Sequence, residues 1–477
     1  MVVGLEGNPV TLDPRLAQDA YSTRILPLVF EGLVILDRNS EPRPCLAESW
    51  EMPDSLTWVF HLKKGRKCPD GNEINSRDVL YTFESLSDPD LRSPRKVILD
   101  RIEYMEAPDD YTVVFRLKGP YAPFLIDMVM GIVPEDADES EEFASRPYGS
   151  GPYMVQNFEP GEAVELIKNP HYGGQPPNMK SIEFRVLPDN VTRVMALEKG
   201  DIHLIQNSVP PDDVPLLEKN EKISVIMEPG INYTYLGFNL TDPILDDRRV
   251  RAAIAHAIDR EKLAECLLKG TVTPASSLLA PTHWAYTPDV ETYPYDPELA
   301  RKLLDESGFP DPEGPDPRFS LVFKTSQNKS RRWVAEAIAD QLGKAGIDVS
   351  VRSSEWGSFF ADVREGNFQV YSLTWVGTTD PDIYYWAMNS ESLPPAGANR
   401  NRYVSEEMDE LTQKGRAAPD RETRVAIYAR VQELAAIDLP YISLWHSNNI
   451  VAIDRRLSGF EIYPGGDYRS LARARWE

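Results

Sequence analysis

The sequence between residues 46 and 86 constrains the fold more than any other part of the chain. It reads LAESWEMPDSLTWVFHLKKGRKCPDGNEINSRDVLYTFESL. Large apolar residues alternate with other residues over 57–62, which is the period of a strand with one buried face. Turn residues follow at 69–71, and Asn75 or Ser76 can cap a helix. The stretch therefore predicts strand, turn, strand, turn and helix, and it carries no catalytic chemistry.

Length and charge limit the possible classes of protein. A chain of 477 residues is too long for a single core, so two or three domains are expected. A net charge of −24 argues against nucleic acid or an anionic membrane surface as the main partner. No apolar run approaches the ~18 residues that a membrane span needs. The composition predicts a soluble globular protein.

The chain carries few signals of catalysis or metal binding. It contains no nucleophile elbow, no His-Glu-x-x-His and no nucleotide-binding loop. The glycine-rich stretch at 149–153 lacks the Lys-Ser/Thr pair of a phosphate loop. The acidic run at 135–142 is interpreted as a solvated face rather than a cation site. A binding protein is therefore favoured over an enzyme such as a hydrolase, and a turnover assay would separate the two.

The three cysteines do not make a disulfide framework, because their number is odd. Cys45 and Cys68 flank the predicted strands, so a pair between them and two free thiols both stay open. No cysteine and histidine have the spacing of a metal site.

Several segments resemble the family 5 extracellular solute-binding proteins, which are the oligopeptide, dipeptide and nickel receptors of ABC importers. The strongest likeness lies in LAESW and TWVFHLKKGRKCPDG within the 46–86 stretch. Further likenesses are GSGPY at 149–153, LEKGDI at 197–202 and DRRVRAAIAHAIDR at 247–260.

The resemblance implies an α/β fold of the two-lobe periplasmic-binding-protein type (type II, cluster C) with an extra small α/β subdomain. Strands that alternate with helices after residue 296 independently favour a partly parallel sheet. Crossings near 238 and 446 would form a hinge for closure of the lobes. The expected division is lobe I from 1–37, 149–238 and 447–477, an extra subdomain from 38–148, and lobe II from 239–446.

The same resemblance implies the function. A monomeric receptor would capture a small peptide or peptide-like ligand in the interlobe cleft and deliver it to the permease subunits of an ABC transporter. No cofactor, no metal and no nucleic acid are expected. The expected location is the periplasm or the outer face of the cytoplasmic membrane. Since Met1 leads directly into a predicted strand, the export signal is expected to have been removed, and a cytosolic protein stays the alternative.

Candidate ligand-binding residues are aromatic side chains and polar groups in segments that match the family's cleft. A nickel or haem receptor of the same fold stays open, with His283 and His446 as its candidates. For each aromatic residue, a role in the core is an equal alternative. The candidates are Asn8, Tyr21, Tyr233, Tyr235, Trp284, Trp356, Trp375, Gly377, Thr378, Asp380 and Trp445.

The segment 375–382, WVGTTDPD, departs from the pattern of peptide-binding relatives. Their first aspartate in this loop receives the α-ammonium of the peptide, a charge-assisted bond. Here Thr378 stands at or near that position, and the loop is one residue shorter. Asp380, Asp382 or Glu6 could supply the charge instead. The sequence therefore predicts weak selection for a free amine.

Overall fold

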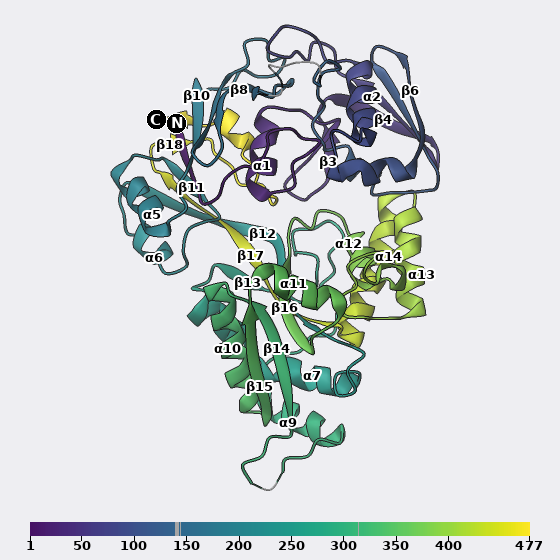
Figure 1. Ribbon diagram of the computed structural model, residues 1–477, viewed down its shortest axis with the longest axis vertical. Helices are drawn as coiled ribbons and strands as arrows, with labels where there is room; N and C mark the ends of the chain where they lie inside the picture. Colours follow the sequence, from purple (N-terminus) through teal and green to yellow (C-terminus); the bar gives the residue numbers. More distant parts are fainter. Residues whose placement is uncertain (139–142, 144, 313) are drawn as a thin grey trace. The chain divides into compact units, whose positions relative to one another are not determined.

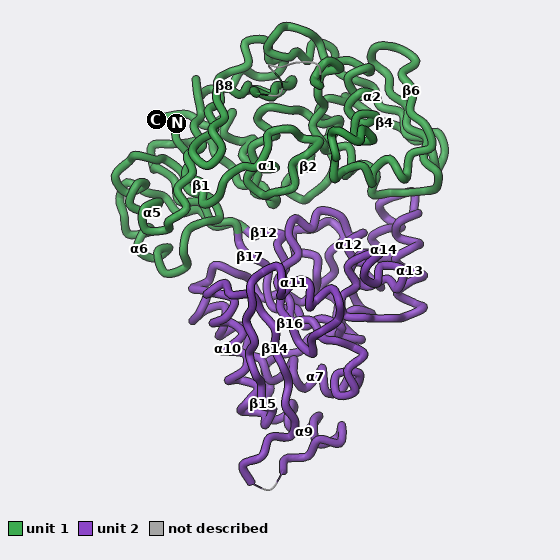
Figure 2. The backbone as a smooth tube through the Cα atoms, in the orientation of Figure 1, with its two compact units in different colours: residues 1–228, 449–477 green, residues 229–448 purple. Residues whose placement is uncertain are grey.

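The computed structural model describes residues 1–138, 143, 145–312 and 314–477 (Figure 1). The chain forms two compact units, one of residues 1–228 with 449–477 and the other of residues 229–448 (Figure 2). It passes from one unit to the other within the long strands β12 (Ile223–Phe238) and β17 (Tyr441–Asp454). The predicted division into two lobes and a separate subdomain stays a prediction.

The first unit contains a mixed sheet of strands from both ends of the chain. β1 (Val2–Leu5) pairs in parallel with β10 (Ser181–Val186) and with β11 (Leu204–Gln206). Helix α5 (Asn190–Lys199) connects β10 to β11 and ends at Gly200 in the left-handed conformation. β9 (Ala163–Lys168) and β8 (Tyr153–Glu159) extend the sheet in antiparallel fashion. On the other side of the sheet, β11 pairs with β17 in antiparallel fashion, with Leu204 opposite Ile453 and Gln206 opposite Val451.

The 46–86 stretch folds as its sequence predicts. Its strands β4 (Ala47–Asp54) and β5 (Thr57–Leu62) form a four-stranded antiparallel sheet with β7 (Thr112–Leu117) and β6 (Ile102–Asp109). Helix α2 (Ser76–Glu84) follows, and the Asn75 side chain accepts a hydrogen bond from the Arg77 amide at 2.8 Å. Four phenylalanines interlock beneath this sheet, because the ring of Phe115 lies within 6 Å of those of Phe60, Phe83 and Phe124.

Shorter elements complete the first unit. They are α1 (Ala20–Ile25), the hairpin of β2 (Val34–Leu36) and β3 (Pro42–Pro44), α3 (Phe124–Asp127), α6 (Val214–Leu217), and the pair of β18 (Leu457–Ser458) and β19 (Arg475–Trp476).

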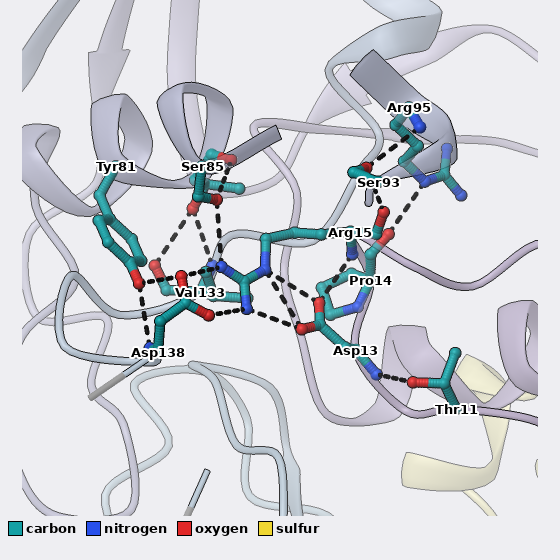
Figure 3. A network of polar contacts seen from close by, with 11 residues as sticks. Thr11, Asp13, Pro14, Arg15, Tyr81, Ser85, Ser93, Arg95, Val133 and Asp138 are labelled. Carbon is teal, nitrogen blue, oxygen red and sulfur yellow. Dashed lines mark hydrogen bonds and ion pairs between the residues drawn. The ribbon is translucent and has the colours of Figure 1, made fainter. Parts of the chain in front are cut away.

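A buried arginine joins three separate segments of the first unit (Figure 3). The Arg15 guanidinium contacts both oxygens of Asp13 and both oxygens of Asp138, at distances from 2.7 to 3.2 Å. It also donates to the Ser85 hydroxyl at 3.1 Å, and Tyr81 donates to Asp138 at 2.5 Å. The Arg15 side chain is 1% exposed, so its charge is balanced inside the protein rather than by water.

The second unit is built around a partly parallel sheet, which confirms the prediction from the alternating elements. β14 (Phe319–Ser326) pairs in parallel with β15 (Ile347–Ser354) and with β16 (Val370–Trp375). Helix α10 (Lys329–Gly343) connects β14 to β15, and α11 (Trp356–Glu365) connects β15 to β16. β12 then adds to β16 in antiparallel fashion.

The other elements of the second unit are mostly helical. The Asp247 side chain caps α7 as predicted, since it accepts from the Arg249 amide at 2.8 Å. The elements are α7 (Arg248–Ala257), α8 (Arg260–Lys262), β13 (Val272–Pro274), α9 (Pro297–Glu306), α12 (Ile383–Met388), α13 (Glu406–Ala417) and α14 (Arg421–Asp438).

The structure answers two questions that the sequence left open. Cys45 and Cys68 are both free thiols, so they do not pair. Residues 139–142 of the acidic run lie outside the described residues, and Asp138 within it is an ion-pair partner of Arg15. Nowhere in the described chain is there a helix with both the length and the apolar character of a membrane span.

Candidate ligand-binding site

The loop that follows β16 is held by the two strands beside it. Tyr233 of β12 lies opposite Trp375, the last residue of β16. Gly377 then turns the chain at φ +69°, a conformation that favours glycine, and its amide donates to the Asn232 side chain at 3.0 Å. Thr378 is 5% exposed, and its hydroxyl oxygen has no hydrogen-bond partner in the described structure. The loop therefore presents a buried neutral hydroxyl at or near the position where the resemblance to peptide-binding relatives predicts a carboxylate.

Asp380 is already neutralised within the second unit. Its two oxygens accept from the Arg424 guanidinium at 2.6 and 3.1 Å, in a bidentate pair. The side chains are only 8% exposed for Arg424 and 11% exposed for Asp380. A carboxylate held in this way is poorly placed to receive an amine from a ligand.

Asp382 has a partner of the same kind. Arg416 donates to its two oxygens at 2.8 and 2.9 Å. Burial raises the pKa of Asp382, and Arg416 opposes this shift. The Arg416 guanidinium also lies 3.5 Å from the ring centre of Tyr385. Both aspartates of the loop are thus bound to arginines from helices that come later in the sequence.

His283 supports the loop from another segment. Its Nε2 lies 3.1 Å from the Thr379 carbonyl oxygen, which can only accept, so Nε2 donates. Its Nδ1 accepts from the Ala285 amide at 3.1 Å. The imidazole is therefore neutral, with its tautomer fixed by the backbone. Nε2 of His446 is likewise 3.1 Å from the Ser277 carbonyl oxygen.

The two histidines do not form a metal centre with neighbouring groups. Among the described residues, no cluster of three or more His, Cys, Asp or Glu side chains could hold a metal ion. The nickel hypothesis therefore gains no geometric support from His283 and His446.

Acid should weaken the fold through His283. Burial lowers the pKa of this imidazole to about 4. The unfolded chain binds a proton near pH 6.5, so it holds more protons than the native state between pH 6.5 and 4. Above pH 6.5 the imidazole is neutral in both states and costs the fold nothing. Acidification to pH 4 should lower the free energy of unfolding by about 3 kcal/mol. Unfolding by urea across this range in wild type and His283→Gln measures the difference. The exposed His171→Gln is the control, and equal pH slopes in wild type and His283→Gln would contradict the assignment.

Tyr233 and Tyr235 are buried in the core of the second unit. The Tyr233 hydroxyl is 2.7 Å from that of Ser443, and the ring centre of Tyr235 is 4.0 Å from that of Tyr441. A cavity of about 60 Å³ beside Tyr233 and Tyr441 holds a few water molecules at most. Since ligand pockets span roughly 300–1,000 Å³, this cavity is too small for a peptide.

The predicted tryptophans occupy different environments. The ring centre of Trp284 is 5.2 Å from the Arg424 guanidinium. Since Arg424 binds Asp380, Trp284 lies near that ion pair. Trp356 is 49% exposed at the start of α11. Trp445 is buried in the hydrophobic core beside β13, which favours a packing role. Trp375 is partly buried, and its indole nitrogen has no partner in the described structure.

The remaining two candidates lie in the first unit. The Asn8 side chain accepts from the Gly161 amide at 2.7 Å. The Tyr21 ring packs on the backbone of Gly7, where a Cβ atom would lie 2.3 Å from the ring. Their contact with a ligand stays a prediction, as it does for every candidate residue.

Three arginines that the sequence analysis did not single out contact the 375–382 segment. Arg416 and Arg424 bind its aspartates, and the Arg400 guanidinium lies 5.0 Å from the ring centre of its Trp375. A fourth, Arg331, lies 5.7 Å from the ring centre of Trp356 at the start of α11. The sequence gives one indirect signal for Arg400, which sits in the unusual basic and amide run NRNR at 399–402.

A family model decides where this chain belongs. Residues 41–393 match the bacterial extracellular solute-binding proteins, family 5 middle. The chain belongs to this family. The predicted resemblance and the predicted α/β two-lobe fold class are thereby confirmed.

Proteins with known names match nearly the whole length of the chain. The dipeptide-binding protein of Escherichia coli K12 is 28% identical over 97% of this chain and 92% of its own length. The structure of the oligopeptide-binding protein AppA of Bacillus subtilis in complex with a nonapeptide has a TM-score of 0.80 and 27% identity, over 100% of this chain and 98% of its own. NikZ of Campylobacter jejuni in complex with Ni(L-His) has a TM-score of 0.82 at 23% identity, which indicates a shared fold.

Proposed function

We propose that this protein is the substrate-binding component of an ABC importer and that it captures a peptide-like solute for delivery to the permease. The similarity over nearly the whole chain to two peptide-binding proteins supports this proposal. One is named a dipeptide-binding protein, and the other was solved in complex with a nonapeptide. The protein would act outside the cytoplasm as a monomer and would bind its ligand without changing it covalently. Binding of the ligand is assigned to the loop after β16 and the aromatic residues around it.

Two measurements test the class of function. Mass spectrometry of the purified protein under native conditions should detect a co-purified peptide-like ligand. Incubation with peptide and ester substrates should release no product. Closure of the two predicted lobes stays a prediction, for which solution scattering with and without ligand should show compaction. Turnover at enzyme-like rates would contradict the proposal.

Thr378 should make the protein indifferent to the ligand's amine. A neutral hydroxyl contributes ~0.5–1.5 kcal/mol to a hydrogen bond, against ~1.5–3 for a charged partner. Both nearby aspartates are bound to arginines, so neither is free to take the place of the carboxylate that the family resemblance predicts here. Calorimetry should therefore find that free and N-acetylated peptides bind wild type within ~tenfold of each other.

Thr378→Asp tests the same assignment by a gain of function. We expect this variant to prefer free over N-acetylated peptides, because it restores a carboxylate at the family's position. Thr378→Asn has the same shape without the charge and is the matched control. A loss of more than ~tenfold on acetylation in the wild type would refute the prediction.

A further inference from the structure

A second cavity of the second unit lies between helix α10 and the segment that follows α8. Its volume is about 420 Å³, which falls within the roughly 300–1,000 Å³ of small-molecule sites. The cavity beside Tyr233 and Tyr441 is far smaller, at about 60 Å³. We name the larger cavity the α10 pocket, and its lining includes Asp259, Lys262, Leu263, Tyr295, Ala337 and Gln341.

The α10 pocket is separate from the loop that follows β16. Since β14 and β16 are parallel, their last residues, Ser326 and Trp375, lie at the same edge of the sheet. Helix α10 starts near that edge at Lys329 and runs back toward the start of β15 at Ile347. The pocket is lined by the end of this helix, within 337–344, so it lies toward the opposite edge.

A π-helical turn forms one wall of the pocket. It covers Leu263–Leu267, and the Leu268 amide donates to the Leu263 carbonyl oxygen at 3.2 Å, the bond between residues five apart that defines such a turn. Turns of this kind are rare and occur frequently at functional sites. Leu263 is 5% exposed, and Ala337 and Tyr295 add further apolar surface to the lining. The pocket can therefore hold an apolar group.

The same pocket has one charged group of each sign without a counter-charge. Asp259 Oδ1 accepts from the Lys262 amide at 2.9 Å, while its Oδ2 has no hydrogen-bond partner among the described residues. The Lys262 ammonium forms no ion pair within that part of the chain. Asp340 and Lys344, which also line the pocket, instead pair with each other at 2.7 Å.

Asp259 is held in place by both elements that form the pocket. Its amide donates to Gln341 Oε1 of α10 at 2.8 Å, and its Oδ1 caps α8. Because Gln341 accepts this bond through Oε1, its Nε2 remains a donor, and Nε2 has no partner in the described chain. A carboxylate that is fixed before a ligand arrives loses little conformational entropy on binding.

We propose that the α10 pocket binds the zwitterion of a free apolar amino acid. Asp259 accepts a charge-assisted hydrogen bond from the α-ammonium, and Lys262 and Gln341 donate to the α-carboxylate. The apolar side chain of the amino acid packs on Leu263 and Tyr295. An amino acid carries both charges on one carbon atom, which matches a pocket with one unpaired charge of each sign. The inference goes beyond the proposed function, because it requires neither a peptide nor the loop after β16.

Four ligands with the same aromatic ring test the two charges. Phenylalanine carries both charges, phenylacetate only the carboxylate, phenethylamine only the ammonium, and benzyl alcohol neither. In calorimetry with the whole chain, phenylalanine should bind at least ~tenfold more tightly than each of the others. Equal or tighter binding of a ligand with one charge or none would overturn the zwitterion, and no binding of any of the four would overturn the site.

Asp259→Asn and Lys262→Gln should each weaken the binding of phenylalanine at least ~tenfold. Asparagine keeps the oxygen that caps α8, so the variant should fold, and thermal unfolding verifies this. Lys344→Gln is the matched control, because Lys344 lines the same pocket but pairs with Asp340. We expect this control to bind phenylalanine as the wild type does. Wild-type affinity in both charge variants would refute the assignment.

Cys266 reports where phenylalanine binds. Its thiol is exposed and lines the α10 pocket, whereas Cys68 is buried. Bound phenylalanine should slow the alkylation of Cys266 by iodoacetamide, measured by mass spectrometry of the digested protein. An unchanged rate at a concentration that saturates the calorimetric signal would place phenylalanine elsewhere and overturn the pocket. A peptide ligand of the proposed function should leave this rate unchanged, so the two assignments can fail separately.

Discussion

Arg15→Met is expected to lower the free energy of unfolding by about 3–5 kcal/mol, the usual effect of removing one partner from a buried ion pair. The change leaves Asp13, whose side chain is 11% exposed, without the guanidinium that neutralises it. It also removes the link between the 13–15 turn, the Ser85 hydroxyl of the segment after α2, and Asp138 (Figure 3). Urea unfolding followed by circular dichroism measures the loss.

Two further variants separate charge from packing. The double variant Asp13→Asn with Arg15→Met removes the more deeply buried carboxylate, and the other partner of Arg15, Asp138, has a side chain that is 39% exposed. Part of the lost stability should therefore return. Arg43→Met is the surface control, because Arg43 pairs with Asp37 and Glu41 but is 53% exposed. We expect its unfolding midpoint to match that of wild type. An Arg15→Met protein as stable as the wild type would show that the network contributes little.

The elements of the 46–86 stretch could be predicted because their causes are local. Strand alternation over 57–62 places Phe60 on the buried face, and the strand forms as β5 with that face inward. Asn75 caps α2 within two residues of its own position. The parallel strands β14, β15 and β16 follow from the alternation of strands and helices over residues 319–375.

The roles of the loop aspartates could not be predicted, because their partners are distant in sequence. Asp380 binds Arg424 across 44 residues, and Asp382 binds Arg416 across 34. A sequence shows an aspartate beside a proline, which indicates a turn or a cap and equally suits a ligand contact. Only the packing of α13 and α14 beside the loop distinguishes these roles.

The same limit explains why the arginines beside Trp356 and Trp375 could not be predicted. Arg331 and Arg400 are 69 positions apart, and neither belongs to a motif that points to a ligand. Trp356 and Trp375 were predicted from their likeness to cleft segments, but the charges that accompany them come from folding.

Asp380→Asn decides whether this carboxylate serves the fold or the ligand. The substitution leaves the Arg424 guanidinium, which is 8% exposed, without its charge partner, and Gly415 offers it one carbonyl oxygen at 3.3 Å. We expect a loss of about 3–5 kcal/mol in the free energy of unfolding. Glu410→Gln is the control, because it removes one partner of an exposed pair with Lys414 on neighbouring α13.

The affinity for peptides, measured beside stability, distinguishes a structural role of Asp380 from a ligand-binding role. If Asp380 acts through Arg424, the double variant Asp380→Asn with Arg424→Met should recover stability relative to the single variant, because the charge left unpaired is removed with its partner. Folded Asp380→Asn should then bind free and N-acetylated peptides as the wild type does. If instead Asp380 receives the amine of the ligand, the single variant keeps its stability and loses affinity for free peptides alone. The bidentate geometry favours the first outcome, since one carboxylate cannot hold a buried arginine with both oxygens and also neutralise an incoming ammonium.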